Sequence, residues 1–120
     1  MILALHHIQI VMPKGGEAEA RRFYGGVLGL PEVEKPEPLR ARGGVWFETP
    51  TTGIHIGVEE PFVAARKAHP AFQVASLTAA IQRMEAHGVA YRRDIDLPGI
   101  QRIYISDPFG NRIELLERVA

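Results

Sequence analysis

Four side chains that could together bind one divalent metal ion are spread along this 120-residue chain: His7, His55, His69 and Glu114. Imidazole nitrogens and carboxylate oxygens are ligands for Zn, Ni, Co, Fe(II) and Mn, and the donor types do not distinguish among these metals. Taken singly, a strand histidine is more often a hydrogen-bonded or surface residue, and Glu114 could be an ordinary exposed carboxylate. The metal hypothesis therefore depends on the spacing of the four residues.

The chain can be read as two copies of one order of elements, in which a strand and a helix precede three strands. When the glycines that end the two helices are aligned, His55 and Glu114 fall at the same distance downstream. His7 and His69 likewise occupy the first strand of each copy. Such internal repetition predicts two copies of one structural unit. Equivalent places in the two copies thus hold three imidazoles and one carboxylate, which predicts a shared metal site.

The first strand is predicted by the alternation of apolar and polar residues over residues 3–12. The apolar side chains share one face, and His7 lies on the other. His6 falls at the frayed end of the apolar face, so we expect it to be partly solvated and a bystander to the site. His7 is the histidine that we expect to point into a cavity.

The remaining elements are bounded by recognisable signals. A helix begins near Glu17 and ends at Gly29, and internal glycines predict an irregular last turn. A second helix is capped by Ser76 and ended by Gly88. The sequence DPFG predicts a type I turn that joins the last two strands as a hairpin. The predicted strands are residues 3–12, 32–35, 44–48, 54–59, 69–74, 91–95, 102–106 and 112–117.

Composition limits the class of protein. Fourteen Lys and Arg residues balance fourteen Asp and Glu residues, and cysteine is absent. A nucleic-acid or membrane-surface role, a disulfide and a thiol nucleophile are therefore not expected. The basic runs at 20–22 and 91–93 are typical of solvated faces. Since no apolar run suits a signal peptide or a membrane span, we expect a cytoplasmic protein whose partner is a small-molecule substrate.

Five stretches of the sequence resemble the vicinal oxygen chelate superfamily, which includes glyoxalase I, bleomycin-resistance proteins and extradiol dioxygenases. The stretches are HHIQIVM, RRFYGGVLGL, HPAFQV, HGV and DPFGNRIELLE. The resemblance implies an α+β fold, with one glyoxalase-like domain over residues 1–120. Its two βαβββ modules, residues 1–60 and 66–120, would form open curved sheets. These sheets would pair into barrels across a homodimer.

The metal ligands of the superfamily match His7, His55, His69 and Glu114. In the homodimer that the resemblance implies, His7 and His55 of one chain would meet the other two ligands from the partner chain. Superfamily members use the metal to hold two neighbouring oxygens, which implies a metal-dependent lyase or isomerase of the glyoxalase type with the metal as Lewis acid. Glyoxalase I has glutamate at the position of His55, so proton transfer here would fall to Glu114 or His55.

Two other functions remain open at this point. A metal-free protein that sequesters an antibiotic-type compound would need cavity walls such as Trp46, Tyr104 and Phe109. A ring-cleaving dioxygenase would need Fe(II) or Mn together with oxygen, and a fourth ligand at His55 would crowd the metal in such an enzyme. Arg102 alternates with Tyr104 along one predicted strand, so both could contact a polar substrate.

Overall fold

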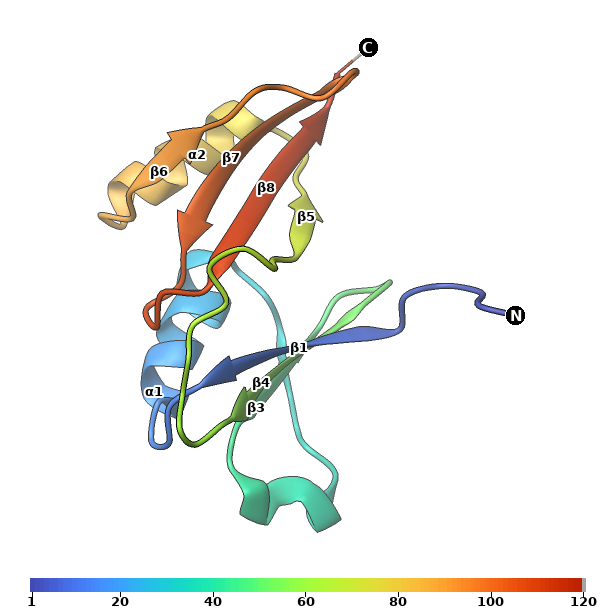
Figure 1. Ribbon diagram of the computed structural model, residues 1–120, viewed down its shortest axis with the longest axis vertical. Coiled ribbons are helices and arrows are strands. Elements are labelled where there is room, and N and C mark those ends of the chain that lie inside the picture. The colour runs from blue at the N-terminus through green and yellow to red at the C-terminus, as the bar shows by residue number, and fades with distance from the viewer. Residues whose placement is uncertain (120) are drawn as a thin grey trace. The chain divides into compact units, whose positions relative to one another are not determined.

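The computed structural model describes residues 1–119, and the chain forms two compact units, Met1–Ala64 and Ala65–Ala120 (Figure 1). Each unit contains a strand and a helix followed by three strands. The strands of each unit form one four-stranded sheet. The predicted α+β fold with two βαβββ modules is therefore confirmed. Neither sheet closes into a barrel within the described part of the chain.

The first unit has the strand order β1-β4-β3-β2, in which β1 is parallel to β4 and the other pairs are antiparallel. Its elements are β1 (His7–Met12), α1 (Glu17–Ala20), a π-helical continuation (Arg21–Val27), β2 (Glu32–Val33), a 3₁₀ helix (Glu37–Arg42), β3 (Val45–Glu48) and β4 (Gly53–Val58). On β4, Ile54 and Ile56 are fully buried. His55 lies between them and points to the other face, as alternation along a strand requires.

The first helix changes its hydrogen-bond spacing where two glycines follow Tyr24. Leu28 N donates to Phe23 O at 2.9 Å, five residues back, and this wider turn is a π-helix. Phe23 and Tyr24 are both buried by this turn, with the Tyr24 ring 6.1 Å from that of Phe47 on β3. The irregular last turn predicted from the glycines is confirmed.

The second unit repeats the topology with the strand order β5-β8-β7-β6. Its elements are β5 (Ala71–Gln73), α2 (Leu77–Ala86), β6 (Tyr91–Arg93), β7 (Ile100–Ser106) and β8 (Arg112–Arg118). Ser76 caps α2 by accepting a hydrogen bond from Ala79 N at 3.1 Å. Gly110 N donates to Asp107 O at 3.1 Å and closes the predicted turn between β7 and β8. The cap and the hairpin are both confirmed.

Two strands begin later than predicted, and one helix was not predicted. The first strand begins at His7 instead of residue 3, because β4 pairs with it only from Gly53 onward. The fifth strand begins at Ala71, so His69 precedes the strand that it was expected to open. Pro70 has no N–H to donate, although its carbonyl accepts from Glu114 N at 3.0 Å. The 3₁₀ helix in the first unit was not predicted.

Glu17 joins the first helix to the start of β3, and this contact makes stability depend on pH. Its carboxylate accepts a hydrogen bond from Gly44 N at 2.9 Å, which lowers the pKa of Glu17 below its usual value. A carboxylate with a depressed folded-state pKa stabilises the fold above its unfolded pKa and loses that effect as pH falls through the folded value. We expect Glu17→Gln to cost about 1 kcal/mol at pH 7.

Urea denaturation of wild type and Glu17→Gln between pH 7 and pH 3 measures this effect. The difference in unfolding free energy should shrink as the pH falls below the ordinary value of 4.5 for this carboxyl group. Glu19→Gln, which removes an exposed carboxylate from the same helix, should show little difference at any pH. A Glu17→Gln penalty that stays constant over the range would contradict the prediction.

No helix within residues 1–119 combines the length and the apolar character needed to cross a membrane.

Candidate functional site

Two of the four predicted ligands lie side by side on the first sheet. The His55 ring on β4 is stacked between Trp46, at a centroid distance of 3.7 Å, and His7, at 4.5 Å. Gly53 makes room for both histidines. A Cβ there would lie 3.1 Å from His7 Cβ and 3.4 Å from His55 Nε2. The lack of a side chain at Gly53 thus lets the two imidazoles share one face.

The environment of His55 favours its neutral form. The residue is only 9% exposed, and this burial lowers the pKa of His55 below its usual value. Charge on the neighbouring His7 lowers the pKa further. A neutral imidazole keeps a lone pair, which is the state that binds a metal ion.

His6 is exposed, as expected, and it also contacts the neighbouring His7. Its Nδ1 lies 2.9 Å from Nδ1 of His7, so one of these nitrogens donates a hydrogen bond to the other. When His7 is the donor, its Nε2 keeps the lone pair and can serve as a ligand. A contact of this kind orients a metal-binding histidine and selects its tautomer.

The other two predicted ligands form a close pair on the second unit. His69 Nε2 lies 3.0 Å from Glu114 Oε1, and His69 Nδ1 donates to Lys67 O at 2.8 Å. A neutral His69 with its proton on Nδ1 has only a lone pair on Nε2. That lone pair would face a carboxylate oxygen, which is also an acceptor. The contact is satisfied by a proton on either atom, or by a metal ion that both atoms bind.

The two pairs occupy equivalent places in the two sheets. In the first sheet, the residue opposite His55 lies two positions after His7. In the second, the residue opposite Glu114 lies two positions after His69. Within residues 1–119, no three His, Cys, Asp or Glu side chains gather into a group that could hold a metal. Each pair therefore brings together two of the four predicted ligands.

Arg102 compensates the charge of Glu114 within the chain. Glu114 is 4% exposed, and its Oε1 accepts a hydrogen bond from Arg102 Nη1 at 3.3 Å. The same Nη1 donates to Tyr104 Oη at 2.9 Å, and Arg102 Nε donates to Ile95 O at 3.0 Å. Arg102 and Tyr104 thus lie on the face that carries Glu114. A buried carboxylate with such a partner is stable even without a metal.

Phe109, the remaining aromatic candidate for substrate contact, lies in the turn between β7 and β8 and is half-buried. Its N–H donates to Asp107 Oδ1 at 2.9 Å. Phe109 therefore belongs to the hairpin turn, whereas Tyr104 projects from a strand.

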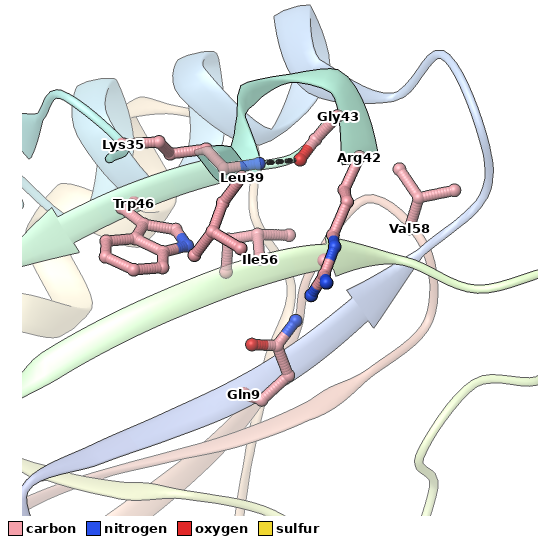
Figure 2. A pocket seen from close by; sticks show the side chains of 9 residues that line it. Gln9, Lys35, Leu39, Arg42, Gly43, Trp46, Ile56 and Val58 are labelled. Atoms are coloured by element: carbon pink, nitrogen blue, oxygen red, sulfur yellow. Dashed lines mark hydrogen bonds between the residues drawn. The ribbon is translucent and has the colours of Figure 1, made fainter. Parts of the chain in front are cut away.

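A cavity of about 210 Å³ opens on the first sheet beside Trp46 (Figure 2). Ligand sites commonly measure about 300–1,000 Å³, so this cavity suits a small molecule or part of one. Figure 2 shows the Arg42 guanidinium extending toward the Gln9 amide, while the Lys35 ammonium group donates to Gly43 O. None of these polar residues was predicted to belong to a site. Two lining residues, Leu39 and Arg42, come from the 3₁₀ helix that was not predicted.

Comparison with known proteins identifies the family. Residues 4–115 match the model of the Glyoxalase/Bleomycin resistance protein/Dioxygenase superfamily. The chain belongs to this superfamily. The resemblance inferred from the sequence is therefore confirmed.

Similar proteins occur in several organisms. The crystal structure of a glyoxalase family protein from Bacillus anthracis has 45% identity and a TM-score of 0.95, with 98% of this chain and 97% of that chain covered. "Glyoxylase I 4" of Arabidopsis thaliana is 28% identical over 95% of this chain and 70% of its own length. The fosfomycin resistance protein of Listeria monocytogenes, at 21% identity, TM-score 0.75, and coverage of 98% and 94%, shows the fold alone.

The superfamily match extends over both copies of the repeat and includes all four predicted ligands. Glyoxalase, fosfomycin resistance and dioxygenase proteins all occur among the matches. Because one fold carries several chemistries, function has to be argued from the side chains of this chain.

Proposed function

We propose that this superfamily member is a metal-dependent lyase or isomerase of the glyoxalase type. Its substrate would be a small molecule with two neighbouring oxygens. The observation that supports this proposal is the close approach of two possible metal ligands, His69 Nε2 and Glu114 Oε1, which lie 3.0 Å apart. Adjacent ligands bound at about 2.0–2.1 Å to one ion in a right-angled arrangement lie about 3 Å apart. A divalent cation therefore fits between these two atoms, and Zn, Ni, Co, Fe and Mn all suit the donors.

The complete site in this proposal belongs to a cytoplasmic homodimer. His7 and His55 of one subunit would be joined by His69 and Glu114 of the partner subunit. Two features support this arrangement. The two pairs have the same register in their sheets, and neither pair reaches three ligands by itself.

A bound divalent ion would supply Lewis-acid polarisation of a substrate carbonyl. The protein groups have separate tasks around it. Glu114 is the candidate general base, because its carboxylate is held in place by Arg102 at 3.3 Å. His55, kept neutral by burial, is the alternative proton acceptor. Trp46 would form an apolar wall beside the substrate.

A metal-free binding protein is the second candidate function. It is favoured by the contact between Arg102 and Glu114, which already neutralises the buried carboxylate. A proton on His69 would satisfy the remaining pair without a metal. The cavity beside Trp46 would then hold the compound. The two candidates differ in whether the protein needs a metal ion.

Metal analysis of protein purified without chelator tests the proposal. We expect about one ion per chain, and we expect chelator-treated protein to take up metal again. His55→Ala and Glu114→Ala should weaken metal binding at least tenfold, since loss even of supporting contacts has such effects. His87→Ala removes an exposed histidine that is not a proposed ligand and should bind metal normally.

Activity is measured in the same samples. NMR assays with a panel of small hydroxycarbonyl compounds should show turnover that chelation stops and added metal restores. Absence of bound metal together with no uptake would overturn the proposal. Tight, chelator-insensitive binding of a compound without turnover would support the metal-free alternative.

A further inference from the structure

Three arginines surround Tyr104 on the second sheet. The guanidinium carbons of Arg92, Arg112 and Arg102 lie 4.7, 4.8 and 5.5 Å from the centroid of the Tyr104 ring. Cross-strand pairing explains the arrangement, because Tyr104 on β7 is opposite Arg92 on β6 and Glu114 on β8. These side chains share the face of the sheet that carries Glu114.

The acidic groups on this face do not balance all three arginines. Glu114 and Asp94 both pair with Arg102, at 3.3 and 3.7 Å. Arg92 and Arg112 have no ion pair with any residue in the described range 1–119. Both guanidinium groups lie beside the Tyr104 ring, at 4.7 and 4.8 Å from its centroid, and their N–H donors are available to a bound anion.

Only one of the two arginines on β6 belongs to this cluster, because successive side chains on a strand point to opposite faces. The run YRR was expected to be solvated and all three residues are exposed, but its two arginines point to opposite faces of the sheet. Arg92 is opposite Tyr104, whereas Arg93 is opposite Ile103, a fully buried residue on the other face. Arg93 therefore has the same charge on the same strand but lies outside the cluster.

We infer that Arg92 and Arg112 bind an oxyanion, a carboxylate or phosphoryl group, with the Tyr104 ring as the platform that holds both guanidinium groups. The planar fork of N–H donors in arginine matches the oxygens of such groups. The inference rests on the proposed function in one respect, namely that the oxyanion is the acidic group of the substrate. The oxyanion would then lie beside Glu114, and the substrate would carry a carboxylate or phosphoryl group.

Calorimetric titration of chelator-treated protein tests anion binding without any metal. Sodium phosphate and sodium acetate serve as probes at pH 7 and constant ionic strength. We expect saturable binding of at least one probe to wild type. Arg92→Gln and Arg112→Gln should each weaken it about tenfold, the typical effect of losing a hydrogen bond to a charged group. Arg93→Gln is the matched control and should bind like wild type.

The outcomes separate this inference from the proposed function. Binding of one probe in preference to the other supports the site and identifies its oxyanion. Lack of saturable binding by both probes, or an equal loss in Arg93→Gln, overturns the inference. Metal uptake by Arg92→Gln and Arg112→Gln should be unchanged, because neither residue is a proposed ligand. Thermal unfolding verifies that the variants are folded, and the exposed Arg92 carries the test should Arg112→Gln not fold.

Discussion

Glu114→Leu should destabilise the metal-free protein by about 2–3 kcal/mol. The substitution leaves Arg102 without the carboxylate that it contacts at 3.3 Å. The Arg102 side chain is only 14% exposed, and its other carboxylate contact, Asp94, is at 3.7 Å. Breaking a buried ion pair by removing one member costs about 3–5 kcal/mol, and the partial exposure of Arg102 reduces the expected cost.

A double-mutant cycle checks the cause of this loss. Arg102→Leu combined with Glu114→Leu removes both charges, so the double variant should be more stable than the sum of the single effects predicts. Urea denaturation at pH 7 in the presence of chelator gives the four free energies. Asp96→Leu, which removes an exposed carboxylate, is the control and should change stability little. Additive single effects would show that the pair is not coupled.

Gly44→Ala should destabilise the protein by about 3 kcal/mol or more. Gly44 has a φ of 92°, and a Cβ at this position would lie 2.5 Å from the backbone oxygen of Ile56. Ile56 cannot move aside easily, because it pairs with Val45 in the sheet. Strain from an unfavourable backbone angle costs about 1–3 kcal/mol, and the clash with the backbone adds to it.

Gly26→Ala is the matched comparison for Gly44→Ala. Apart from the adjacent residues and the backbone of its own helix, no atom of the described residues lies within 4 Å of the Cβ that this substitution would add, and Gly26 is within the helical segment. It should stabilise the protein by about 0.5–1 kcal/mol, since alanine reduces the entropy of the unfolded chain. Urea denaturation of both variants measures the contrast. Equal effects of the two substitutions would contradict the steric explanation for Gly44.

The repeat and the faces on which His55 and Glu114 lie could be predicted because they depend on alternation within single strands. His55 and Glu114 each lie between aliphatic residues that the structure buries, which assigns both polar groups to the opposite face. Metal binding, the homodimer and the catalytic roles stay predictions, because they involve a bound ion, a second chain and a substrate.

The arginine cluster and the cavity were missed because they depend on contacts between distant segments. Arg92 is placed against Tyr104 by the pairing of β6 with β7. Arg42 reaches the cavity from a 3₁₀ helix that has no hydrophobic periodicity to reveal it. The role of His6 was predicted only from the face of the strand on which it lies. Its contact with the adjacent His7 was not predicted.

The amino-acid pattern alone thus determined the two modules, the faces on which His55 and Glu114 lie and the glycines that end the helices. Only the tertiary structure decided which side chains meet across strands, including Trp46 on His55 and Arg102 on Glu114. The physical reason is that side-chain direction follows from the geometry of one strand, whereas register is set by hydrogen bonds between segments far apart in the chain.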